Sequence, residues 1–253
     1  MTEAGADAMA TTAIRAAAAL AEDVRHRLYA FTRAARRPVT REEAAAAVGI
    51  SRKLAAFHLD KLVAVGLLHY RFGGGGPARV GRRPKVYEPA DTDIQVSIPA
   101  RRHDVLAGIL VEALLTEQQH GTAKAAAAHA AHELGLTAAA AVRDRVEPGR
   151  MEAERALSLA EEIVSAYGFE PDRVATGCIR LRNCPFHPIV QRAPQLVCQL
   201  NHAFMVGVTE GLQAAAVDAV LAPVAGECCV ELRERTPSPA PTAPSSTGRL
   251  PHH

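Results

Sequence analysis

The sequence predicts an α+β protein in which long helical segments alternate with two groups of short strands. Apolar residues recur at helical spacing over much of the chain, as Leu20, Val24 and Leu28 illustrate. Short apolar runs bounded by Gly or Pro indicate strands near residues 67–88 and again after residue 170. The chain of 253 residues is long enough for two domains, and all five of its cysteines lie in the last third.

The first predicted elements are helices with polar residues at their starts. We expect residues 1–10 to be disordered and a helix to run over residues 12–35. Thr40 should cap the next helix, because Glu43 stands three residues later as in a capping box, and Gly49 should end it. The segment that follows these helices, residues 51–88, is the most informative about function.

A third helix should begin after Ser51, whose hydroxyl can cap it. Its buried side should consist of four leucines, Leu54, Leu59, Leu62 and Leu67. Its opposite side should present Arg52, Lys53, Ala56 and Asp60. Strands over residues 67–72 and 86–88 follow, and the glycine-rich segment between them is basic. The order of helix, short turn, capped helix and basic hairpin predicts a winged helix-turn-helix.

This predicted domain has the chemistry of a DNA-binding module. Arg52 and Lys53, in the first turn of a capped helix, can meet base edges and phosphates in the major groove. A basic wing adds phosphate contacts that do not depend on sequence. The candidate DNA-binding residues are Ser51, Arg52, Lys53, Ala56, Phe57, Arg79, Arg82, Arg83 and Lys85. A domain used only for protein–protein contact is the alternative, and His58 should face the packed side as a structural histidine.

The distribution of charge also separates the two ends of the chain. Residues 1–90 carry 15 Lys and Arg against 8 Asp and Glu, a net charge of about +7, whereas residues 91–253 carry 14 against 19, about −5. This asymmetry is typical of a nucleic-acid module joined to a regulatory or assembly module. No segment resembles a signal peptide or a membrane span of roughly 20 apolar residues, so we expect a cytoplasmic protein with no membrane partner.

The second half of the chain is predicted to be helical first and then mixed. Helices are expected over residues 101–118, 122–134 and 152–167, with Gly135 ending the second. Two strands, a helix and two strands should follow over residues 173–176, 178–183, 194–213, 217–222 and 227–232. The expected domains are a disordered N-terminus (1–10), the winged helix-turn-helix (11–90), a helical linker and dimerisation region (91–167), a small cysteine-containing α+β sensor domain (168–235) and a disordered tail (236–253).

The cysteines of the last third are candidate ligands of a metal centre. In a reducing compartment, such thiols indicate metal, cluster or redox ligands rather than disulfides. A turn, a helix and a strand should carry the candidate ligands Cys184, Cys198, Cys228 and Cys229, with His187, Cys178 and His202 as alternatives. Only one of Cys228 and Cys229 should face the site if both lie in regular strand. Thiolates suit an iron–sulfur cluster or structural zinc, and buried small apolar residues are the competing interpretation.

Two parts of the sequence resemble a known family. Residues 51–68, with the run His58-Leu59-Asp60-Lys61-Leu62, resemble the ArsR-type winged-helix repressors. The larger arrangement resembles the SufR-like repressors, through Gly168-Phe169-Glu170-Pro171, Asn183-Cys184-Pro185-Phe186-His187, Val197-Cys198 and Gly226-Glu227-Cys228-Cys229. Two departures matter: residues 1–177 contain no cysteine, unlike direct metal sensors, and the four evenly spaced cysteines of the best-known SufR-like members are absent. Cluster type and fourth ligand therefore stay open.

The resemblance implies a non-enzymatic transcription regulator, a repressor that binds an inverted-repeat operator in double-stranded DNA as a homodimer. In that family a 4Fe-4S or 2Fe-2S cluster reports iron–sulfur supply and oxidative stress. The Ala-rich helices of residues 101–167 should form the dimer contact. The first alternative keeps DNA binding and replaces the cluster with zinc or a small ligand. The second is a cysteine enzyme fused to a DNA-binding module, with Cys184 and His187 as its candidate pair.

Overall fold

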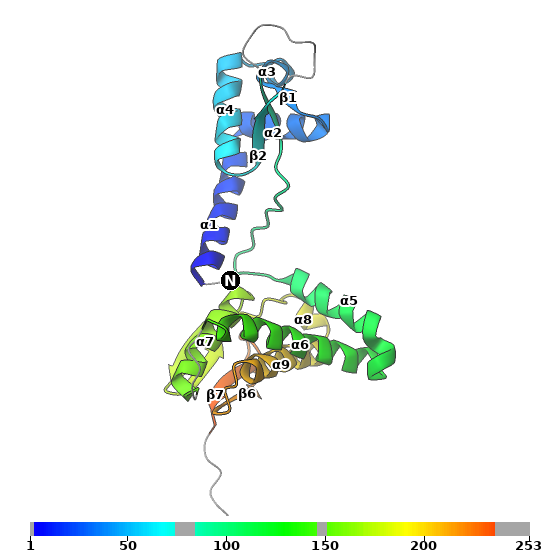
Figure 1. Cartoon of the computed structure of the whole chain (residues 1–253), viewed down its shortest axis with the longest axis vertical. Helices are drawn as coiled ribbons and strands as arrows, with labels where there is room; N and C mark the ends of the chain where they lie inside the picture. The colour runs from blue at the N-terminus through cyan, green and yellow to red at the C-terminus, as the bar shows by residue number, and fades with distance from the viewer. Residues whose placement is uncertain (1–2, 74–83, 146–150, 236–253) are drawn as a thin grey trace, which may run out of the picture. The chain divides into compact units, whose positions relative to one another are not determined.

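The computed structural model describes residues 3–73, 84–145 and 151–235, and it is a mixed α+β fold with two small antiparallel sheets, as the sequence predicts. The chain forms two compact units, residues 1–101 and 102–253 (Figure 1). Each unit has its own hydrophobic core, so each is described by itself. No helix in these described ranges is long and apolar enough to cross a membrane.

In its described residues, 3–73 and 84–101, the first unit has four helices and a three-stranded sheet. Its elements are α1 (Glu3–Leu20), α2 (Asp23–Ala35), β1 (Val39–Thr40), α3 (Arg41–Val48), α4 (Arg52–Ala64), β2 (Leu68–Phe72) and β3 (Lys85–Pro89). The strands pair in the antiparallel order β1-β3-β2, with Tyr70 opposite Tyr87. Leu28, Leu59 and Leu62 are fully buried in the core that joins α2 to α4.

The single helix expected over residues 12–35 is wrong, because the structure has two helices there. The side chain of Glu22 accepts hydrogen bonds from the backbone N–H groups of Val24 and Arg25. That carboxylate starts α2 as a new helix, since it satisfies N–H groups that an uninterrupted helix would use internally. In addition, α1 begins at Glu3, within the stretch expected to be disordered.

The caps of the next two helices are confirmed, but one predicted core residue is not. Thr40 and Glu43 form the expected capping box, and the Ser51 hydroxyl accepts a hydrogen bond of 3.2 Å from Leu54 N–H. Leu54 itself is 41% exposed, so its assignment to the core was wrong. The buried stripe of α4 consists of Ala55, His58, Leu59 and Leu62. Leu54 lies to one side of that stripe, because each residue turns the helix by about 100°.

Over residues 102–145 and 151–235, the second unit packs five helices and a four-stranded antiparallel sheet around one core. Its elements are α5 (His103–His120), α6 (Ala123–Arg143), α7 (Ala153–Ala166), β4 (Pro171–Ala175), β5 (Cys178–Leu181), α8 (Ile189–Arg192), α9 (Pro194–Gly211), β6 (Val217–Leu221) and β7 (Val230–Glu234). The strand order is β4-β5-β7-β6. Helix α9 packs on α6 and on β6 and β7 (Figure 1). The helices of residues 101–167 thus share their core with the cysteine-bearing elements.

Gly135 does not end a helix, which corrects the prediction for residues 122–134. Helix α6 continues to Arg143, and Gly135 faces the backbone of α9. A Cβ atom at Gly135 would overlap the carbonyl oxygen of Phe204, and one at Gly207 would overlap that of His132. These two glycines therefore allow the backbones of α6 and α9 to approach each other more closely than larger side chains would.

We predict that Gly207→Ala lowers the free energy of unfolding by about 1–3 kcal/mol, because the added methyl group overpacks the α6–α9 contact. Urea unfolding of the full chain, followed by circular dichroism, measures the effect. Gly108→Ala is the matched control, since Gly108 lies in α5 and no heavy atom stands within 4 Å of its Cβ position. The control should gain up to about 1 kcal/mol from helix propensity. Equal stability of the two variants would contradict the close approach.

Candidate functional site

The exposed start of α4 carries most of the predicted DNA-binding residues that the structure describes. Arg52 and Lys53 lie in its first turn, both are exposed, and neither forms an ion pair with a described residue. Ala56 is half-buried and Phe57 is 54% exposed. This surface therefore offers two exposed cations and an apolar ring. A hydrogen bond from the preceding residue and, less strongly, the Arg52 charge lower the pKa of Glu42. Arg79, Arg82 and Arg83 lie outside the described residues.

Lys85, the remaining predicted phosphate contact, is tied to α4 and to the sheet. Its ammonium group forms an ion pair with Asp60 and lies 3.9 Å from the centre of the Tyr70 ring. The buried Tyr87 also donates a hydrogen bond of 3.0 Å to Asp60. Asp60 therefore fixes the strand pair β2–β3 against the helix. Because its charge is neutralised inside the unit, Lys85 is less free for an external anion than Arg52.

The structure adds exposed aromatic residues that the sequence analysis did not select. Tyr70 and Phe72 are 45% and 55% exposed, and their rings meet edge to face on β2. The Lys61 ammonium group lies 5.7 Å from the centre of the Phe57 ring on α4. Tyr70 and Phe72 alternate with His69 and Arg71 in the strand, and that period-2 pattern was a signal that could have found them.

In the second unit, the candidate cysteines lie on three separate segments, and a backbone hydrogen bond joins two of these segments. Cys184 lies in the turn after β5, and its carbonyl oxygen accepts from His187 N–H at 3.1 Å. Cys198 lies near the start of α9. Cys228 N–H donates to the carbonyl oxygen of Leu181 at the end of β5, at 2.8 Å, which holds the segment before β7 beside that turn.

Salt bridges and aromatic packing also hold the turn after β5 and the segment before β7 in place. Arg182 forms ion pairs with Asp172 on β4 and with Glu227, the residue before the cysteine pair. Phe186 is 4% exposed, and the centre of its ring lies 6.4 Å from the centre of the Phe169 ring. The turn that carries Cys184 is therefore anchored in the core two residues further along the chain.

Both members of the pair Cys228-Cys229 take part in the site, because the condition for alternation, that both lie in regular strand, is not met. They precede β7, which begins only at Val230, so the rule for regular strand does not apply. Both thiols are buried. The Cys229 carbonyl oxygen accepts from Ala222 N–H at 2.8 Å, which fixes the segment on its β6 side.

The four cysteines Cys184, Cys198, Cys228 and Cys229 form one thiol cluster, in which each sulfur interacts with at least one other. Burial, with hydrogen bonding to Cys229, raises the pKa of Cys198 to about 12. Hydrogen bonding to Cys184 raises the pKa of Cys228 strongly. The hydrogen bond from Cys228 lowers the pKa of Cys229 to about 7, against the effect of burial. The cluster thus favours a thiolate at Cys229, while the raised pKa values of Cys198 and Cys228 favour their neutral thiols.

A buried amide completes the surroundings of the sulfurs. Asn201 on α9 is 1% exposed, and its Nδ2 lies 3.7 Å from Sγ of both Cys184 and Cys228. It also hydrogen-bonds to Cys229 and contributes to the low pKa of that thiol. Sequence reasoning missed Asn201; its position three residues after Cys198, one helical turn away, was the available signal.

The described side-chain interactions do not join the alternative ligands to the thiol cluster. The imidazole of His202 is 3.1 Å from the carbonyl oxygen of Ala219 on β6, so its ring is engaged there. Cys178 begins β5, opposite Ala175 and Arg233, and the described interactions do not join its sulfur to the cluster. The same holds for the ring of His187, whose backbone carbonyl oxygen meets His103 Nε2 at 3.1 Å. The structure therefore brings together the four cysteines named first.

The donor set fits an iron–sulfur cluster or a structural zinc ion chemically. Both are held by thiolates, and four sulfurs from three segments supply the required number. Over residues 3–73, 84–145 and 151–235, no group of three or more His, Cys, Asp or Glu side chains is placed to hold a single metal ion. The sulfurs instead contact one another. The fit therefore rests on the identity of the donors and on the buried amide beside them.

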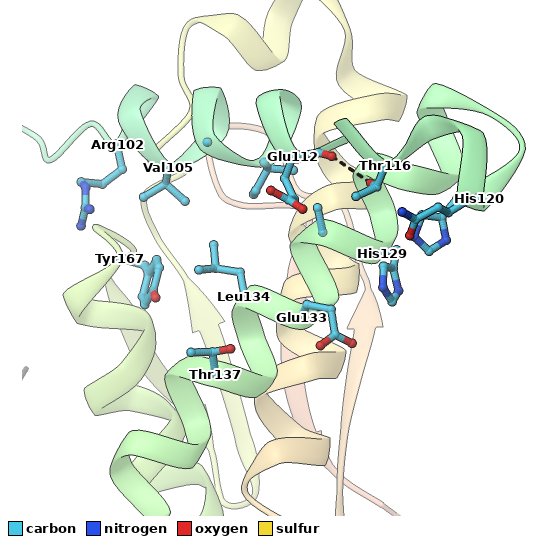
Figure 2. Close-up of a pocket in the computed structure, with 14 residues that line it drawn as sticks. Arg102, Val105, Glu112, Thr116, His120, His129, Glu133, Leu134, Thr137 and Tyr167 are labelled. Carbon is cyan, nitrogen blue, oxygen red and sulfur yellow. Dashed lines mark hydrogen bonds between the residues drawn. The ribbon is translucent and has the colours of Figure 1, made fainter. Parts of the chain in front are cut away.

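A separate groove of about 580 Å³ lies between α5 and α6 (Figure 2). Val105, Ile109 and Leu134 contribute apolar lining, and the rings of His120 and His129 stand 4.2 Å apart at one end. The groove shares no lining residue with the thiol cluster. No motif in the sequence indicated it, because its lining comes from ordinary helical positions on two neighbouring helices.

Comparison with protein-family models, curated proteins and solved structures finds no match to this chain.

Proposed function

We propose that this protein is a DNA-binding transcription regulator, a repressor, whose C-terminal unit holds an iron–sulfur cluster on Cys184, Cys198, Cys228 and Cys229. The observation that carries the proposal is the convergence of these four cysteines, which span residues 184–229, in one thiol cluster. Four buried small apolar residues would not need to meet. The resemblance of the sequence motifs to those of SufR-like repressors supports the same conclusion.

The first unit supports the DNA-binding half of the proposal. Its order of α2, α3, capped α4 and the strand pair β2–β3 is compatible with the expected winged helix-turn-helix, and the proposal takes α4 as the recognition helix. In this proposal the exposed cations of Arg52 and Lys53 stand where base edges would be read. Residues 1–90 carry a net charge of about +7. This charge favours a polyanionic partner with regularly spaced charges over an acidic protein surface whose charges do not repeat.

The proposed regulator is a homodimer, because its operator would be an inverted repeat and because α5 has an exposed apolar stripe. An inverted repeat presents two equivalent half-sites, which a two-fold dimer matches. Val111, Leu114 and Leu115 on α5 are 56%, 69% and 74% exposed, an apolar stripe that a second copy would cover. We therefore place the dimer contact on α5, within the region of residues 101–167.

Zinc is the second candidate occupant, because four cysteines are also a structural zinc set. An iron–sulfur cluster would supply redox and oxygen sensitivity, which zinc lacks. The contribution of the chain is the same in both cases: Cys228 and Cys229 enter from the strand side, Cys184 from the turn and Cys198 from the helix. Metal analysis of protein purified without oxygen separates the two occupants.

We predict that anaerobic preparations are brown and that Cys184→Ser or Cys198→Ser removes most of the iron. Cys178→Ser is the matched control and should retain iron, since Cys178 lies outside the thiol cluster. Iron and acid-labile sulfide are measured per chain, beside the visible spectrum. Normal iron in both of the first two variants would refute the ligand assignment. A colourless protein with one equivalent of zinc would select zinc.

We predict that Arg52→Ala weakens binding to DNA selected from a random pool and relaxes sequence choice, by about 1–3 kcal/mol at the contacted base. Arg82→Ala should weaken binding to all duplexes alike and reduce the salt slope by about one. Fluorescence anisotropy at several salt concentrations measures both effects. Arg145→Ala is the control, because Arg145 is an exposed arginine of the second unit paired with Glu162. Unchanged DNA binding by Arg52→Ala would remove α4 as the recognition helix.

A further inference from the structure

Asn201 occupies an unusual position for a buried amide. Its side chain is 1% exposed, and it directs Nδ2 at the sulfurs of Cys184 and Cys228, at 3.7 Å from each. Its Oδ1 atom is buried and has no hydrogen-bond partner among the described residues. A buried polar atom without a partner costs about 1–3 kcal/mol. An apolar residue of similar size at this place on α9 would avoid that cost, so stability alone does not account for the asparagine.

The orientation of the amide is informative about the sulfurs. An amide nitrogen only donates hydrogen bonds, whereas a neutral thiol is a weak donor and a weak acceptor. If the cysteines functioned as neutral thiols, the amide oxygen could instead accept from their S–H groups. Two N–H donors aimed at two sulfurs suit the negatively charged thiolates that would bind a metal, because hydrogen bonds to charged acceptors are roughly twice as strong as neutral ones.

We propose that Asn201 is a positioning residue of the metal centre, which stabilises negative charge on the sulfurs of Cys184 and Cys228 and so strengthens metal retention and favours the reduced state of the cluster. This inference rests on the proposed function for its redox part. Its metal-binding part needs only the thiol cluster. Partners of this kind, which hydrogen-bond to the ligand atoms, typically contribute 10–100-fold to metal affinity, and hydrogen bonds to cluster sulfurs help to set reduction potentials.

The first arm of the test uses cadmium ions and the full-length apo protein, so it does not depend on cluster assembly. The absorbance of cadmium–thiolate bonds reports binding under anaerobic conditions. Asn201→Leu should weaken cadmium binding by about tenfold, because it keeps the volume and removes both donors. Thr209→Val is the control: Thr209 is a buried residue of the same helix, and its hydroxyl donates only to the Val206 carbonyl oxygen. The control should bind cadmium as the unmodified protein does.

A second pair of variants separates hydrogen bonding from packing. Asn201→Ala and Asn201→Ser both leave a cavity, and they differ by one hydroxyl group that can donate to a sulfur. The serine variant should bind cadmium more tightly than the alanine variant. This comparison holds even if Asn201→Leu fails to fold. Equal affinities of the alanine and serine variants would overturn the proposal, and so would an Asn201→Leu affinity equal to that of the unmodified protein.

The second arm measures the midpoint potential of the anaerobically reconstituted protein by a redox titration. Asn201→Leu should shift the ratio of reduced to oxidised cluster about tenfold towards the oxidised form at a fixed solution potential, which is about 59 mV for a one-electron couple. An unchanged potential would overturn the redox part. If the unmodified protein takes up no iron but binds cadmium with the expected dependence on Asn201, the proposed cluster fails and the positioning role stands. Absence of cadmium binding by the unmodified protein would overturn the positioning role.

Discussion

The close approach of α6 and α9 is the contact on which the second unit depends. Gly135 and Gly207 lie where the two backbones meet, and a side chain at either position would force the helices apart. Helix α9 carries Cys198 and Asn201, and its other side packs on β6 and β7 (Figure 1). The distance between α6 and α9 therefore sets where one thiol and the buried amide stand relative to the strand ends.

The thiol cluster joins the turn after β5, helix α9 and the segment before β7. The Cys228–Leu181 backbone hydrogen bond and the ion pairs of Arg182 fix the segment before β7 against the end of β5. A metal centre bound to these segments would add bonds among a turn, a helix and a strand. Its loss would release them, and it can change DNA affinity only if the two states place the DNA-binding units differently.

Local chemistry was predictable from the sequence, whereas three-dimensional neighbours were not. The caps at Thr40 and Ser51 follow from hydrogen bonds within one turn, and they were found from residue type and spacing. Gly135 was taken for a helix end, because a sequence does not show that a second backbone passes that position. Both Cys228 and Cys229 were named as candidate ligands, but the strand expected over residues 227–232 would have turned one of them away; β7 begins only at Val230, after both of them. The contact of Asn201 with the sulfurs of Cys184 and Cys228 was not predictable, because those cysteines come from other segments of the chain.

The affinity of one selected DNA duplex for holo and apo protein, at a single salt concentration, tests the central claim most directly. A regulator controlled by its metal centre must bind DNA differently in the two states. We expect the holo protein to bind more tightly by at least about tenfold, a coupling free energy of about 1.4 kcal/mol. Equal affinities of the holo and apo forms would contradict the account and make the thiol cluster a structural feature only.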